Sequence, residues 1–326
     1  MQDFNEPDNN NGNTPTGEKH PYQEDYEGLN PIISPILAGF IGLIGGFILY
    51  QFVGGLLTII LIGFDLENAS VSALRLMTMA GQILFILLPA LLFAKWFYND
   101  VGKIIRANST SIKEIGLFSL GIIILTPLMQ AYLHIQNHFI YILAENSAFV
   151  NALKSFFDTM NEMVEKTYGN LLRADSVFEM AFVFFIVAVI PAVSEEVMFR
   201  GYVQKSFELK MTPFRAIMIT AVFFGLYHFN PYGIVPLILL GVFFGYAAYK
   251  TNSIIVPMVL HFLNNFIAVG LFYLIGDDEL IETKVQPSAD LGNYLSVFLG
   301  LCVLFAGLIY LINKFYERKK NYAGIR

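Results

Sequence analysis

Long, continuous apolar runs separated by short polar segments are the main pattern along this chain. A helix needs about 20 mostly apolar residues to cross the hydrocarbon core of a bilayer. The strands of a transmembrane barrel would instead alternate apolar and polar positions over about 10 residues. The pattern therefore predicts an all-α fold, a polytopic integral membrane bundle of about eight transmembrane helices. These predicted helices cover residues 33–63, 73–98, 117–143, 177–199, 213–229, 232–249, 254–275 and 293–313.

Changes in composition divide the chain into four parts. Residues 1–30 are acidic, rich in asparagine and poor in aliphatic side chains, which is typical of a disordered tail. We expect residues 31–176 to hold the first transmembrane helices and a long loop, and residues 177–275 to form a core of further helices. Residues 276–326 are expected to hold the last transmembrane helix and a basic tail.

The long loop, residues 144–176, has a pattern of its own. Its apolar residues recur at helical spacing among polar ones, which predicts an amphipathic helix lying in the membrane interface. These apolar residues are Phe149, Val150, Leu153, Phe156, Phe157, Met160, Met163 and Val164. Two roles for this helix stay open, an anchor in the membrane surface and a lid over a substrate entrance.

Composition and charge agree with a membrane protein and indicate its orientation. Hydrophobic residues make up 56% of the chain and charged residues 14%, which the core of a soluble protein does not explain. Basic residues gather in 95–113, in 200–215, at Lys250 and in the C-terminal tail, all on one side of an eight-helix bundle. We therefore expect a multi-pass protein of the cell inner membrane with both termini in the cytoplasm. The chain has no basic surface for nucleic acid, so the expected partner is the lipid bilayer.

Two pairs of glycines stand four residues apart within apolar runs, Gly42 with Gly46 and Gly241 with Gly245. Missing side chains let the backbones of membrane helices approach closely. We expect both pairs to pack inside the bundle, and a dimer face is the alternative.

Three charged residues stand inside or just after one apolar run. The sequence PAVSEEVMFRGY contains Glu195, Glu196 and Arg200, and each charge near the bilayer centre costs about 2.5–3.5 kcal/mol. Glu196 and Arg200 are four residues apart with the glutamate first, which predicts a helical ion pair. Glu195 points about 100° away from Glu196 and is left for another role. Pro191 is expected to loosen this helix and to open a path for water.

Polar groups of two later helices are expected to meet Glu195. His228 lies as far from the turn between the two helices as Glu195 does, so both stand at a similar depth. His261 and Asn265 are four residues apart and project from one face of a helix. A desolvated carboxylate beside an imidazole can take a proton from water, and a second imidazole with a carboxamide can hold an oxyanion. Together the four residues predict hydrolysis, although either histidine alone would more often be a packing residue.

These residues form an ordered set of motifs with a family likeness. Glu195-Glu196-x-x-x-Arg200, Phe224-x-x-x-His228 and His261-x-x-x-Asn265 resemble the three motifs of the CPBP family. That family contains type II CAAX prenyl endopeptidases and Abi-like bacterial relatives linked to bacteriocin processing and immunity. The resemblance covers about residues 177–270, makes 177–275 a CPBP-like catalytic core, and implies an eight-helix bundle with a cavity open to the cytosol.

The resemblance also implies roles for these residues. Glu195 would be the base that activates water, with His228 assisting it, while His261 and Asn265 would form the oxyanion site. Three more residues would shape and support the pocket: Glu196, Arg200 and Phe224. The implied activity is that of an intramembrane endopeptidase acting on a prenylated (CAAX-type) or otherwise hydrophobic peptide or protein at the membrane.

The sequence leaves alternatives open for the cofactor and for the class of function. Glu195, His228 and His261 could bind a divalent metal such as zinc, as the label metalloprotease often given to the family implies. The HExxH pattern is absent, and the same residues also serve as a metal-free glutamate and imidazole site, which we favour. The other function classes are a non-catalytic membrane scaffold or bacteriocin-immunity protein and a proton-coupled transporter. His134 and His138, also four residues apart, are expected to be packing residues.

Overall fold

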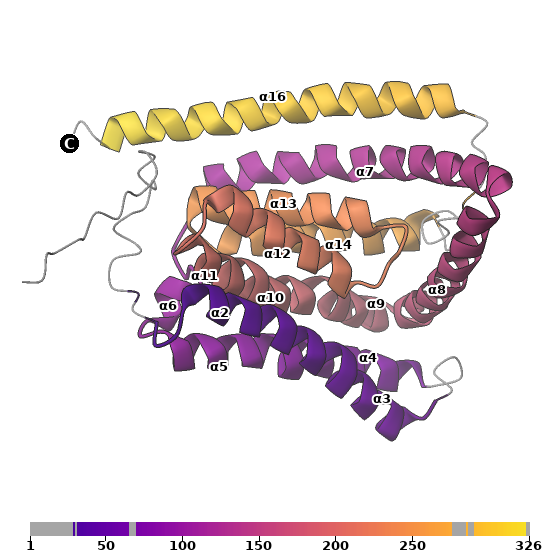
Figure 1. The fold of residues 1–326 in the computed structure, drawn as a ribbon, viewed down its shortest axis with the longest axis horizontal. Helices are drawn as coiled ribbons and strands as arrows, with labels where there is room; N and C mark the ends of the chain where they lie inside the picture. Colours follow the sequence, from indigo (N-terminus) through magenta and orange to yellow (C-terminus); the bar gives the residue numbers. More distant parts are fainter. Residues whose placement is uncertain (1–28, 30, 65–69, 276–284, 286–289, 324–326) are drawn as a thin grey trace, which may run out of the picture.

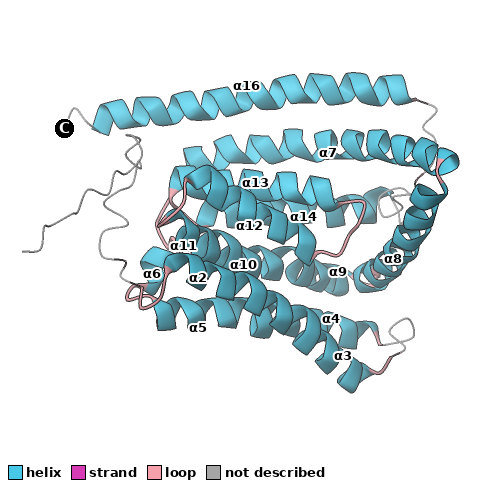
Figure 2. Ribbon diagram, viewed as in Figure 1, coloured by secondary structure: helices cyan, strands magenta, loops and turns pink. Residues whose placement is uncertain are grey.

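The computed structural model describes residue 29 and residues 31–64, 70–275, 285 and 290–323. The predicted disordered tail lies outside these residues apart from Leu29. Within the described ranges every regular element is a helix, and loops join the helices (Figure 2). The all-α fold predicted from the apolar runs is therefore confirmed.

Seven helices of the described chain are long and apolar enough to cross a membrane. They are Pro35–Ile62, Val71–Phe97, Ile112–Asn146, Val177–Glu208, Ile234–Thr251, Ile255–Ile275 and Leu291–Lys319. The eighth predicted helix is α12, Pro213–Tyr227, which is apolar but has only 15 residues. At 1.5 Å per residue it is about 22 Å long, shorter than a hydrocarbon core of about 30 Å. The polytopic bundle is confirmed, with one of its helices shorter than the bilayer core.

Wide π-helical turns divide three of these spans into shorter elements. The first span contains α2 (Pro35–Phe40), η1 (Ile41–Gly45), η2 (Ile48–Gly54) and α3 (Gly55–Ile62), and the second contains α4 (Val71–Gln82), η3 (Ile83–Leu87) and α5 (Leu88–Phe97). The span Val177–Glu208 contains α9 (Val177–Phe184), η4 (Phe185–Val189), α10 (Ile190–Glu196), η5 (Val197–Val203) and α11 (Gln204–Glu208). The other elements are α6 (Val101–Ile104), α7 (Ile112–Asn146), α8 (Ala148–Leu172), α13 (Ile234–Thr251), α14 (Ile255–Ile275) and α16 (Leu291–Ala323).

The long helices run roughly parallel to one another, as Figure 1 shows. α7 and α16 lie side by side along one face, and α2 to α5 form the opposite face. α12, α13 and α14 lie between them, and α10 packs against α14 and α4. The start of α2 and the end of α16 lie at the same end of the bundle, while α8 crosses the other end.

Local sequence explains where several helices begin and end. Ser111 starts α7 with a capping box: its Oγ accepts from the Glu114 backbone N–H at 3.2 Å, and the Glu114 carboxylate accepts from the Ser111 N–H at 3.0 Å. The Ser147 side chain caps α8 directly after α7 ends. Asn252 ends α13 in the left-handed conformation, with φ at 48°, which asparagine tolerates better than most residues.

The two glycine pairs lie at close contacts between helices. A Cβ atom at Gly42 would lie 2.6 Å from the Tyr202 ring, and one at Gly241 would lie 3.1 Å from the Ala221 Cα. The other glycine of each pair is equally crowded by side chains of neighbouring helices. The prediction that both pairs pack inside the bundle is therefore confirmed.

The helix predicted in the long loop is α8, and hydrogen bonds tie it to the bundle near its middle and at its end. Near its middle, Asp158 Oδ1 accepts a hydrogen bond from the Tyr232 hydroxyl at 2.6 Å. At its end, the Leu171 carbonyl accepts from Arg75 Nε of α4 at 3.1 Å. α8 therefore joins α4 to the loop in front of α13, and its roles as anchor or lid stay predictions.

Candidate active site

Glu196 and Arg200 form the ion pair that their spacing predicts. Arg200 Nη1 donates to Glu196 Oε1 at 2.8 Å, and both side chains are fully buried. His261 Nδ1 lies 2.8 Å from the same oxygen. Because an ionised carboxylate only accepts hydrogen bonds, His261 Nδ1 carries the proton and Nε2 faces other partners. Glu196 thus offsets the charge of Arg200 and fixes the imidazole of α14.

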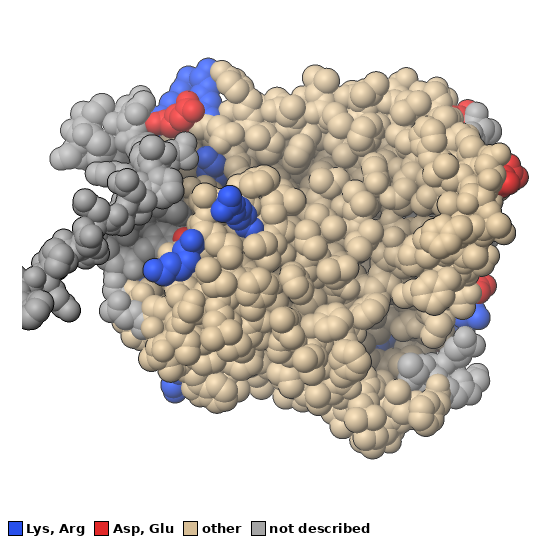
Figure 3. Space-filling view, viewed as in Figure 1, with Lys and Arg blue, Asp and Glu red and all other residues tan. Residues whose placement is uncertain are grey.

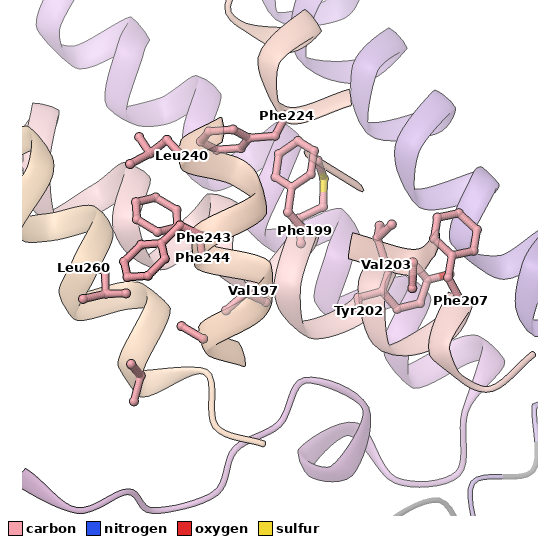
Figure 4. Packing of buried hydrophobic residues seen from close by; sticks show 14 of the residues in the cluster. Val197, Phe199, Tyr202, Val203, Phe207, Phe224, Leu240, Phe243, Phe244 and Leu260 are labelled. Atoms are coloured by element: carbon pink, nitrogen blue, oxygen red, sulfur yellow. The ribbon is translucent and has the colours of Figure 1, made fainter. Parts of the chain in front are cut away.

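Aromatic rings enclose the guanidinium of Arg200. Its Cζ atom lies 4.2 Å from the ring centroid of Phe224 and 5.2 Å from that of Phe244. Arg200 Nη2 also donates to the Gly241 carbonyl at 3.3 Å, where the missing side chain lets α13 come close. Figure 4 shows both phenylalanines among the packed hydrophobic residues of the interior. Cation–π attraction and the carbonyl contact stabilise a charge that would otherwise be costly in an apolar helix.

Phe224 separates the two histidines. Its ring centroid lies 4.8 Å from that of His228 and 5.9 Å from that of His261, both in edge-to-face contact. His228 Nδ1 lies 2.7 Å from the Phe224 carbonyl oxygen, which can only accept. His228 therefore donates from Nδ1, and its neutral ring presents Nε2 as an acceptor. The two imidazoles are held by different partners, so they are not equivalent in chemistry.

The first membrane span holds the turn that carries His228. Gln51 Nε2 donates to the Tyr227 carbonyl at 2.7 Å, one residue before His228. The Tyr227 hydroxyl donates to the carbonyl of Leu43. Phe229 then adopts a left-handed φ of 47°, which turns the chain out of α12. The position of His228 thus depends on residues outside its own helix.

Pro191 explains the position of Asn265. A proline has no N–H, so Pro191 cannot donate to the carbonyl of Val187 four residues earlier in the helix. Asn265 Nδ2 donates to that carbonyl at 2.9 Å, and Asn265 Oδ1 accepts from Asn264 at 3.1 Å. One N–H of the Asn265 amide remains for a further acceptor. The proline therefore creates an acceptor for the helix that carries His261 and Asn265.

Glu195 lies apart from this pair and has a partner that the sequence did not indicate. Its Oε1 accepts a hydrogen bond from Gln82 Nε2, on α4, at 2.9 Å. Its Oε2 is buried and has no hydrogen-bond partner among the described residues. The Glu195 charge interacts with the hydroxyls of Tyr50, Tyr168 and Tyr227, which come from three different helices. A lone glutamine inside the apolar run 73–98 was the available signal for Gln82, but its partner lies 113 residues away.

The predicted residues therefore fall into two neighbouring groups. Glu196 joins Arg200 and His261, and Phe224 joins His261 to His228. Glu195, next to Glu196 in the chain, turns instead towards α4, and no hydrogen bond in the described chain joins it to either histidine.

A zinc centre would need ligand atoms of Glu195, His228 and His261 to meet at one point. Within the described ranges, no group of three or more His, Cys, Asp or Glu side chains could hold a metal ion. His261 Nδ1 is bound to Glu196, and His228 Nδ1 to a backbone carbonyl. Both histidines keep Nε2 for a further partner, and a metal-ligating histidine commonly donates its other ring N–H in this way. The metal-free site therefore stays a prediction.

A second cluster of buried polar residues, which the sequence did not predict, lies at the end of the bundle that holds the start of α2 and the end of α16. Arg106 is fully buried with a left-handed φ of 58°, and its guanidinium lies 2.5 Å from Glu208. Arg106 Nε donates to the Arg200 carbonyl at 3.1 Å. Lys205 Nζ donates to Asn252 Oδ1 at 3.0 Å. The cluster ties the loop after α6 to α11 and α13, and so supports the helix that carries Arg200.

The histidine pair in α7 packs against aromatic rings. The His134 ring stacks on Tyr294 of α16 with centroids 4.1 Å apart, and His138 contacts Phe139 edge to face. The prediction that these histidines are packing residues is confirmed.

One family of known proteins matches the segment that carries these residues. The family described as type II CAAX prenyl endopeptidase Rce1-like matches residues 177–267, from the start of α9 into α14. No curated protein and no solved structure matches the chain significantly. The matched segment contains both glutamates, both histidines and Asn265, while Gln82 lies outside it.

Proposed function

We propose, from the match of residues 177–267 to the type II CAAX prenyl endopeptidase Rce1-like family, that the chain hydrolyses peptide bonds with water activated by Glu195. The chain is an integral membrane protein with the core of a CAAX-type protease. Its substrate in this proposal is a hydrophobic or lipidated peptide or protein at the membrane. Prenylated CAAX-type peptides are the first class to test.

The observation that carries the proposal is the state of the two oxygens of Glu195. One oxygen is held by an amide N–H, and the other is buried without a partner. A carboxylate with little hydration and one unengaged oxygen can remove a proton from a water molecule bound beside it. General-base catalysis of this kind typically contributes about 10²–10⁴-fold to the rate.

The different partners of the two histidines support different roles. His228 presents Nε2 as an acceptor, so it can orient the attacking water by accepting its second hydrogen. His261 already donates from Nδ1 to Glu196, and in the imidazolium form its Nε2–H can also donate to an oxyanion. The remaining N–H of Asn265 is the second donor.

The reaction follows from these assignments. Glu195 takes a proton from water as the water oxygen bonds to the carbonyl carbon of the peptide. The electron pair of the carbonyl bond moves to its oxygen, and His261 and Asn265 stabilise this oxyanion. When the tetrahedral intermediate collapses, the C–N bond breaks and the leaving nitrogen receives the proton from Glu195. The products are a carboxylic acid and an amine, and transfer of the acid proton then gives a carboxylate and an ammonium group.

The proposal extends to orientation, with both termini in the cytoplasm of a cell inner membrane. Lys and Arg gather at the end of the molecule where α16 ends, as Figure 3 shows on one face. Basic residues in short loops favour the cytoplasmic side of a membrane.

Hydrolysis by the full chain in detergent tests this proposal. We expect the wild-type protein to cleave a farnesylated CAAX-type peptide at one bond, as measured by mass spectrometry of both products. His228→Ala should lower kcat by about 10²–10⁴-fold, and His261→Ala by about 10²–10³-fold. His134→Ala, which removes a packing histidine far from the site, should retain the wild-type rate.

The same assay separates the alternatives. Because the candidate ligands are not grouped around one point, we expect a chelator to leave the rate unchanged. Loss of activity with the chelator and its recovery with zinc would contradict that expectation. A folded wild-type protein that cleaves neither this peptide nor its unprenylated form would contradict the proposed substrate class and favour a scaffold or immunity role.

A further inference from the structure

We propose that Gln82 is a positioning residue for Glu195 and completes the catalytic base from outside the family segment. Gln82 is the last residue of α4 and directly precedes the π-helical η3. Its side chain is buried, and Nε2 donates to Glu195 Oε1 at 2.9 Å. The inference rests on the proposed function and names a residue on which that function depends.

The chemistry of the contact defines the geometry of the carboxylate. An ionised carboxylate only accepts, so the amide must present its nitrogen to Glu195. A hydrogen bond to an ionised group is shorter and about twice as strong as a neutral one. It fixes the rotation of the carboxylate about its terminal bond and so sets the direction of Oε2.

The surroundings leave one oxygen of Glu195 for the reaction. Oε1 is held by Gln82, and Oε2 is buried without a hydrogen-bond partner among the described residues. The Tyr50 ring packs close to Gly81, the residue before Gln82, and so supports this part of α4. With Oε1 held, Oε2 is the oxygen that can accept a proton from the attacking water.

Gln82→Met tests this role because methionine keeps an unbranched chain of similar volume without a donor. We expect kcat for the farnesylated peptide to fall by about 10- to 100-fold, as a displaced catalytic group would cause. The KM should stay near the wild-type value, because Gln82 acts on the base and not on the substrate. In Gln82→Asn the side chain is one methylene shorter, so the amide lies further from Glu195. We expect its kcat to lie between those of Gln82→Met and the wild type.

Gln204→Met is the matched control. Gln204 is also buried and also donates to a glutamate, with Nε2 2.8 Å from Glu208 Oε1, and its other hydrogen bond in the described chain goes to the Gly245 carbonyl. Its kcat per folded molecule should equal that of the wild type. A loss of kcat in Gln204→Met as large as in Gln82→Met would overturn the proposal, because any buried glutamine would then have the same effect.

Infrared spectroscopy gives a readout that does not depend on turnover. The antisymmetric carboxylate stretch of Glu195 is the band lost in Glu195→Gln, and we expect it to shift in Gln82→Met and Gln82→Asn. An unshifted band together with a wild-type kcat in either variant overturns the proposal. If Gln82→Met does not fold, the measurements on Gln82→Asn decide the question. If the wild-type protein cleaves no peptide, the proposed function fails, and the band alone decides whether Gln82 orients Glu195.

Discussion

A single oxygen of Glu196 accepts hydrogen bonds from both Arg200 and His261. Helix geometry made the first contact predictable, because residues four apart with the glutamate first face each other. The second contact, from α14, required the tertiary structure. The sequence identified residue types that are costly in a membrane, but it placed His261 with Glu195 in function and did not indicate that Glu196 holds it.

Loss of the Glu196 charge should affect stability and catalysis together. Glu196→Gln leaves Arg200 buried without a counter-charge, and we expect a cost of about 3–5 kcal/mol, seen as a lower melting temperature in detergent. The double variant Glu196→Gln with Arg200→Met removes both charges and should recover most of the stability. It should not recover peptide cleavage, because His261 Nδ1 then lacks the carboxylate that accepts its hydrogen bond and holds the ring in place. Recovery of both would contradict the role given to Glu196.

Among the helices, the apolar runs predicted where the membrane-length helices lie. They did not predict the π-helical turns within three of the spans. The runs marked every membrane-length helix of the described chain, because continuous apolar sequence has few alternatives in a bilayer. The π-helical turns have no comparable signal, since they depend on contacts with neighbouring helices. Pro191 is the exception, because its missing N–H leaves the Val187 carbonyl to be bound by Asn265.

Two glycines of the first span provide a matched test of helix packing. Gly42 faces Tyr202 so closely that a Cβ atom would lie 2.6 Å from its ring, whereas no atom lies within 4 Å of such a Cβ at Gly55. We expect Gly42→Leu to destabilise the bundle by about 1–3 kcal/mol through overpacking. Gly55→Leu should be tolerated. Melting temperatures of the two variants in detergent check this, and equal melting temperatures would contradict the packing described for α2 to η2.

For the whole molecule, the sequence alone predicted the helical bundle and an orientation in the membrane. It did not predict which distant helices contact one another at the site. α4 and the first span contribute Gln82, Tyr50 and Gln51 to the surroundings of Glu195 and His228. These contacts join residues more than a hundred positions apart, which no local pattern encodes. The family segment therefore does not contain the complete site.

Orientation in the membrane can be tested with cysteine labelling. In a Cys302→Ser background, we expect Lys210→Cys, in the loop between α11 and α12, to react with an impermeant reagent from the cytoplasmic side. Asn151→Cys, on the exposed face of α8, should react from the opposite side. Labelling of both from one side would contradict the proposed topology.

The central claim is that the Glu195 carboxylate activates the water that cleaves the peptide. The most direct measurement is the cleavage rate of the farnesylated peptide by Glu195→Gln, compared with wild type at equal amounts of folded protein. Glutamine keeps the shape of the side chain but cannot take a proton, so we predict a kcat lower by about 10²–10⁴-fold or more with little change in KM. A folded Glu195→Gln protein that cleaves at the wild-type rate would contradict the account.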